Sequence, residues 1–69
     1  KEGKMEENRE ALFRAIRKGA PKQEIIYHDH GQFKRFVGGP EEIIEVVTKI
    51  FNSPETMRYG QITNVPGDS

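Results

Sequence analysis

The residues with the most evident capacity for chemistry are His28, Asp29 and His30, which place both histidines of the chain beside one aspartate. Two histidines two positions apart on a strand point to the same face, a spacing that metal sites do use. Zinc needs a third and usually a fourth ligand, and without cysteine these would have to be carboxylates such as Glu24 or Asp29. We therefore predict a polar turn that holds no metal and no cofactor. A pH switch is the less favoured interpretation of the pair, and it rests only on the general rule that unperturbed histidine titrates at about 6.5.

Catalysis has little support in the sequence. Ser53 and Ser69 are the only serines, and neither lies in a nucleophile elbow. Asp29 with His28 could polarise a water molecule, but nothing near them in sequence offers an oxyanion hole or a second base. A chain of 69 residues also leaves little room for an enclosed pocket. We predict a protein that is not an enzyme and has no small-molecule substrate.

A second group of residues interleaves aromatic rings with cations. Aromatic residues beside arginine are common in protein-binding hot spots, so we predict that this group binds another protein or a second copy of the chain. The predicted partner-binding residues are Tyr27, Phe33, Lys34, Arg35 and Phe36. Nucleic-acid surfaces have the same interleaved composition, which gives the alternative function. The alternative nucleic-acid site consists of Arg14, Arg17, Lys18, Lys22, Lys34 and Arg35.

The charge of the chain is neutral overall but unevenly distributed. Eleven basic residues balance eleven acidic ones, which argues against a dedicated nucleic-acid binder. Residues 1–22 contain seven Lys or Arg and four Glu, a balance of +3. Residues 38–69 contain two basic and five acidic residues, a balance of −3. This polarity favours self-association between opposite ends, and salt limits its reach to about 10 Å.

The predicted partner-binding residues lie in a stretch, residues 23–37, whose composition predicts a β-hairpin. If His30 and Gly31 form the loop, one face of the hairpin collects Ile26, His28, Phe33 and Val37, and the other collects Ile25, Tyr27, Lys34 and Phe36. A three-residue loop, Asp29 to Gly31, closing with a bulge would regroup these sets. Both faces are partly apolar in either register. We therefore expect helices on one face and a partner on the other face or at a sheet edge.

A helix is predicted on each side of the hairpin. From Met5 the apolar residues recur at helical spacing, and Gly19 and Pro21 end the segment. The second helix begins at Pro40 and carries a wide apolar stripe that includes Ile43, Val47 and Ile50. These three side chains are expected to be buried against the first helix and one hairpin face.

The predicted fold is a small α+β domain in the order α-β-β-α, with both helices packed on one face of a short antiparallel sheet. Residues 57–63 are compatible with a third strand, with Met57, Tyr59 and Gln61 on one side, or with an irregular segment. We expect one domain over residues 5–63, a flexible lead-in over 1–4 and a flexible tail over 64–69.

The sequence limits the location of the protein only weakly. No apolar run approaches the roughly 20 residues that cross a bilayer, and we expect no membrane partner. The absence of a recognisable signal peptide and of cysteine favours an intracellular location. The predicted function is a non-catalytic, regulatory protein-binding module that uses the face or edge of the hairpin over residues 24–37.

Overall fold

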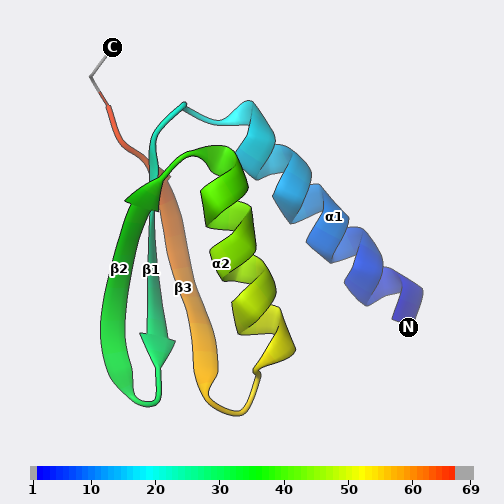
Figure 1. Ribbon diagram of the computed structural model, residues 1–69. Helices are drawn as coiled ribbons and strands as arrows, with labels where there is room; N and C mark the ends of the chain where they lie inside the picture. Colours follow the sequence, from blue (N-terminus) through cyan, green and yellow to red (C-terminus); the bar gives the residue numbers. More distant parts are fainter. Residues whose placement is uncertain (1, 67–69) are drawn as a thin grey trace.

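A three-stranded antiparallel sheet and two helices make up the chain in the computed structural model, which describes residues 2–66 (Figure 1). The elements in chain order are α1 (Glu2–Lys18), β1 (Gln23–Asp29), β2 (Gln32–Gly38), α2 (Pro40–Asn52) and β3 (Met57–Asn64). The predicted α+β class is confirmed, and residues 57–63 do form the core of a third strand. Helix α1 begins earlier than Met5 and takes in most of the expected lead-in. Lys1 and residues 67–69 of the expected tail lie outside the described residues.

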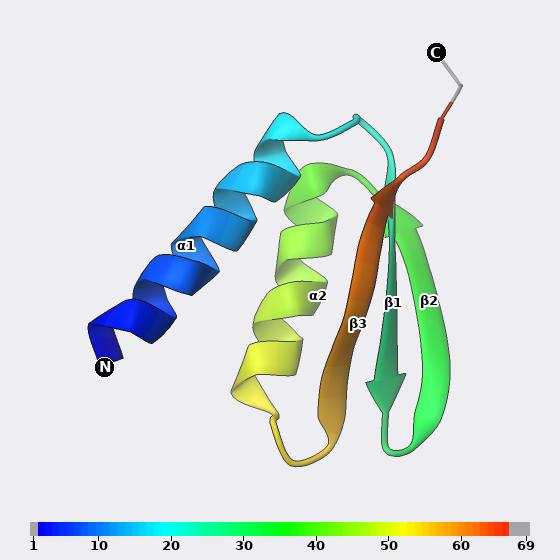
Figure 2. The same cartoon turned by 180° about the vertical axis from the view of Figure 1, so that it is seen from behind.

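Strand β1 is the central strand, and the sheet order is β2-β1-β3 (Figure 2). The β1–β2 register pairs Ile25 with Phe36 and Asp29 with Gln32, so the two-residue loop of His30 and Gly31 is the one observed. Both loop residues have positive φ angles, 52° and 80°, as a type I′ hairpin turn requires. The two predicted hairpin faces are therefore the observed ones.

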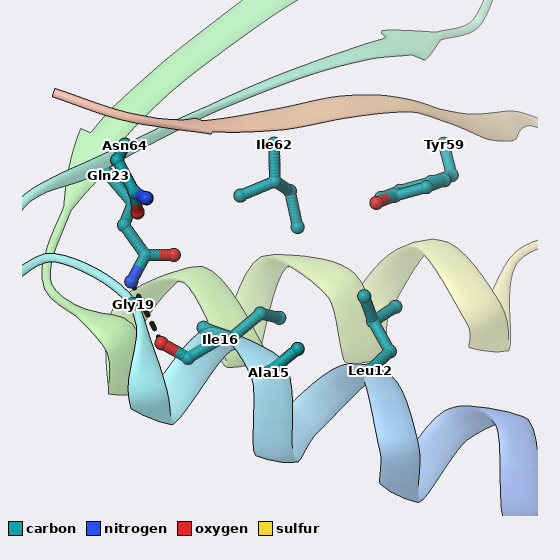
Figure 3. A pocket seen from close by; sticks show the side chains of 8 residues that line it. All are labelled: Leu12, Ala15, Ile16, Gly19, Gln23, Tyr59, Ile62 and Asn64. Atoms are coloured by element: carbon teal, nitrogen blue, oxygen red, sulfur yellow. Dashed lines mark hydrogen bonds between the residues drawn. The ribbon is translucent and has the colours of Figure 1, made fainter.

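Both helices lie on the same side of the sheet (Figure 3), and buried residues of α1, β1 and α2 form the core. Ile43 and Val47 of α2 are fully buried, and so is Ile25 of β1. Ile50 and Ile16 are each 3% exposed, which confirms the predicted core. Helix α2 packs against all three strands, whereas α1 packs against α2.

The ends of α2 follow its sequence signals. The N–H of Gly39 donates to the Glu42 side chain at 2.9 Å, and Pro40 occupies the first turn, where no intrahelical donor is needed. Glu41 and Glu42 lie at the positive end of the helix dipole, and Lys49 lies at the negative end. These contacts stabilise both ends of α2, the helix that supplies most of the buried core residues and so forms the main wall of the core.

A β-bulge interrupts the pairing of β3 with β1. The register pairs Ile26 with Gln61 but Tyr27 with Tyr59, which leaves Gly60 as the extra residue. The expected grouping of Met57, Tyr59 and Gln61 on one side is therefore wrong, because the extra residue shifts the alternation. Met57 packs against the core with Ile62, and Gln61 shares the opposite face with Ile26.

Candidate functional site

The face of the sheet opposite the helices has no cover within residues 2–66. The pairing of the strands places nine residues on it, which we call the open face. They are Glu24, Ile26 and His28 of β1, Phe33, Arg35 and Val37 of β2, and Arg58, Gln61 and Thr63 of β3. Seven of the nine are exposed, and only Glu24 and Ile26, on the central strand, are half-buried. This exposure includes large apolar groups, which a sheet face left to water seldom presents.

The most exposed large apolar side chain is Phe33, at 72%. Its ring stacks on the ring of His28 across the strand pair, with centroids 4.4 Å apart and planes 16° from parallel. A shallow depression of about 210 Å³ lies beside it, lined by Ile26, Phe33, Lys34 and Arg35. The stack joins the Phe33 and His28 rings into one aromatic surface that a partner could contact.

An ion pair crosses the open face between the two strands of the hairpin. The Arg35 Nε donates to Glu24 Oε2 at 2.6 Å, and the Arg35 side chain remains 71% exposed. Arg58 of β3 lies on the other side of β1 from β2 and pairs with His28 in the register. The open face therefore carries two arginines and one glutamate, with apolar residues between them.

The predicted partner-binding residues divide between the two faces. Phe33 and Arg35 lie on the open face, whereas Tyr27 and Phe36 are half-buried and pack against the core. The Lys34 side chain also points to the opposite face of the sheet from Arg35, and its Nζ lies 3.6 Å from Asp29 Oδ2. Sequence reasoning gave both halves of the group equal weight because either hairpin face could have met the helices. The arginine on β3, Arg58, was not among the predicted residues.

The alternative nucleic-acid residues do not form one surface either. Arg17 pairs with Glu41 at 3.0 Å at the start of α2, in the helix layer. Arg14, Lys18 and Lys22 are exposed on α1 and the connection that follows it. Helix α1, with Arg14, Arg17 and Lys18, lies on one side of the sheet (Figure 3), whereas Arg35 lies on the opposite, open face.

The turn at the tip of the hairpin joins the histidine and aspartate that the sequence singled out. His30 Nδ1 lies 2.7 Å from Asp29 Oδ1, and the His30 N–H donates to the Thr56 carbonyl at 2.7 Å. The hydrogen bond from His30, aided by the positive charge of Lys34, lowers the pKa of Asp29. His28 stacks on Phe33 instead of joining this cluster. Among residues 8–66, whose side chains the structure describes, no three metal-binding side chains converge.

A second concave feature, a cleft of about 250 Å³, lies between α1 and β3 (Figure 3). Polar and apolar surface contribute almost equally to its walls, and the polar lining includes Gln23 and Asn64. The lining residues are Leu12, Ala15, Ile16 and Gly19 from α1 and its end, Gln23 from β1, and Tyr59, Ile62 and Asn64 from β3. Partial burial raises the pKa of the Tyr59 phenol in this cleft.

Buried Gln23, which sequence reasoning missed, fixes one end of the cleft. Its Nε2 donates to the carbonyls of Ile16 at 2.8 Å and Ala20 at 2.9 Å. Asn64 Oδ1 accepts from the Ala20 N–H at 3.0 Å, so the end of β3 is tied to the same connection. A glutamine in a strand gives no sign that it will be buried, because its role depends on where α1 ends.

Comparison with known proteins gives no relative from which a function could be transferred: the chain matches no protein-family model, no curated protein and no solved structure. No described helix is long and apolar enough to span a membrane.

Proposed function

We propose that this chain is a non-catalytic protein-binding module and that its open face is the binding surface. The observation that carries the proposal is the 72% exposure of Phe33 on a sheet face that neither α1 nor α2 covers (Figure 3). Burial of an aromatic ring of this size provides a large part of the binding free energy in protein interfaces. Arg35 and Arg58, both exposed, supply the charged contacts that commonly surround such an anchor.

The partner is a protein with an apolar patch and acidic residues around it, or a second copy of the chain. Two copies could pack open face to open face with Phe33 of each near Val37 of the other. The ion pair of Arg35 with Glu24 has little net charge, so a partner can cover it without meeting an isolated buried charge.

Photo-crosslinking tests the proposal directly. A photoreactive amino acid at the position of Val37, on the open face, is expected to give a defined adduct with a partner or with a second copy. The same group at exposed Glu45 on α2 is the matched control and should give none. Phe33→Ser should abolish the adduct while the melting temperature stays within a few degrees, because Phe33 is mostly in water.

Sedimentation distinguishes the two kinds of partner. A second copy would appear as a concentration-dependent dimer that Phe33→Ser converts to a monomer. A monomer at all concentrations, together with no adduct at Val37, would contradict the proposal.

A second candidate function, binding of single-stranded nucleic acid, is favoured by the stack of His28 on Phe33 beside two arginines. Bases stack on exposed aromatic rings of sheets, and arginines contact the phosphates. This version uses Arg35 and Arg58 in place of the cations of α1. Retention on immobilised poly(U) should fall steeply with salt and be lost in Arg58→Glu but not in Arg17→Glu. Equal retention of the two variants would exclude the open face as its site.

A further inference from the structure

We infer that the cleft between α1 and β3 is a second binding site, which takes an extended segment of a partner protein as a fourth strand of the sheet. The outer edge of β3 lies along this cleft and pairs with no strand among residues 2–66. Backbone N–H and C=O groups along such an edge are free to bind another strand. This site is independent of the open face and does not rest on the function proposed for it.

The width of the helix layer gives the first argument. Packed helices lie about 8–10 Å apart, whereas neighbouring strands lie about 4.8 Å apart, so two helices cover about four strands. The sheet has three strands, and α2 alone packs against all of them. Helix α1 instead faces β3 across the cleft (Figure 3). The uncovered position is therefore the place of one additional strand.

The lining of the cleft gives the second argument, because it suits the alternation of a strand. Side chains of an added strand that point toward the helices would contact Leu12 and Ala15 of α1 and lie beside Tyr59 and Ile62 of β3. These contacts are apolar and favour valine or isoleucine at every second position of the segment. The intervening side chains would continue the open face into solvent and can be polar.

Charge gives the third argument and selects the polar residues. The lining of the cleft carries no charge, and Arg58, exposed on the open face, is the sole charged residue of β3. The intervening side chains of an added strand would lie on that face beside Arg58 and therefore meet a positive charge. The expected occupant is an extended peptide in which apolar β-branched residues alternate with Asp or Glu.

The probe for this site is a synthetic peptide as long as β3 in which valine alternates with glutamate. Titration of the full chain should give saturable binding that weakens with salt. Amide exchange should slow along β3 and not along β2. A peptide in which valine alternates with lysine, and a valine–glutamate peptide N-methylated on alternate residues, should both bind at least about tenfold more weakly.

Ala15→Phe is the decisive variant, because it places a ring in the cleft without removing a core side chain. Ala15 is exposed and lines the cleft, whereas Ala11, one turn earlier, is exposed and does not. Ala15→Phe should weaken peptide binding at least about tenfold, and Ala11→Phe should leave it unchanged. Phe33→Ser should also leave it unchanged, which separates this site from the open face.

Four results would overturn the inference. One is the absence of saturable binding by the valine–glutamate peptide, and another is equal binding by the valine–lysine or N-methylated peptide. The third is a Kd that Ala15→Phe does not change. If amide protection along β3 instead rises with the concentration of the chain alone, the occupant is a second copy and the inference of a foreign strand is wrong.

Discussion

Gly60 lies against the backbone carbonyl of Ile26 so closely that a Cβ atom at this position would overlap the carbonyl oxygen. The contact comes from the β-bulge, where Gly60 is the extra residue of β3. Only glycine allows β3 to stay paired with β1 on both sides of the bulge. The bulge in turn directs Ile62 toward the core and Gln61 toward the open face.

Gly60→Ala should lower the free energy of unfolding by about 2 kcal/mol or more, because the clash is with backbone atoms that cannot move without breaking strand pairs. Gly31→Ala is the matched control. Gly31 has a φ of 80° and no atom near its missing Cβ, so its substitution should cost only about 1 kcal/mol for the left-handed conformation. Urea denaturation of the two variants measures the difference, and an equal loss would show that the contact at Gly60 is not restrictive.

Gln23→Leu should destabilise the chain by about 2 kcal/mol, since the carbonyls of Ile16 and Ala20 lose their side-chain donor inside the protein. Gln32→Leu, at an exposed position of the hairpin, is the control and should change the stability little. Amide exchange should also quicken near the end of α1 in Gln23→Leu. Unchanged exchange there would mean that the glutamine does not hold α1 to the sheet.

Val47→Asp should unfold the chain, because Val47 is fully buried and an aspartate there would have no partner. Glu45→Asp, two positions earlier and exposed, should melt within a few degrees of the parent chain. Circular dichroism as a function of temperature distinguishes the two. A cooperative transition of Val47→Asp near the parent melting temperature would contradict the assignment of α2 as the main wall of the core.

The lowered pKa of Asp29 predicts a dependence of stability on acid. A carboxyl whose folded pKa lies below its unfolded value stabilises the fold above the unfolded pKa, near 3.8, and this contribution disappears as the pH falls through the folded pKa. Asp29→Asn should lose that acid-dependent part of the melting curve and be less stable at neutral pH. NMR titration of the Asp29 carboxyl provides the direct measurement, and a midpoint at or above 3.8 would contradict the assigned cause.

Much of the fold followed from local sequence signals. The sequence alone was sufficient to predict the end of α1 before Gly19, the start of α2 at Pro40 and the hairpin loop at Gly31. Each of these features depends only on neighbouring residues. The side on which Gln61 lies could not be predicted, because the bulge at Gly60 exists only through contact with a distant strand. Tertiary packing is what decides such positions.

For the same reason, only part of the candidate site could be predicted from the sequence. Phe33 and Phe36 lie on opposite faces of β2, and either face could have packed against the helices. Because the helices pack on the face of Phe36, Phe36 is half-buried and Phe33 is exposed. The contribution of Arg58 to the open face required knowing that β3 lies beside β1. Predicting the cleft would have required the distance between α1 and β3, which no local sequence pattern contains.

The central position of β1 also governs when the fold can be completed during synthesis. Its pairing with β2 is local, but Ile25 pairs with Ile62, which follows it by 37 positions. A nascent chain can therefore close the hairpin early, yet the second edge of β1 stays unpaired until the last strand leaves the ribosome. In that interval Ile25 and the apolar stripe of α2 lack part of their cover. The chain is consequently most prone to mispairing with other chains in the interval when α2 has left the ribosome and β3 has not.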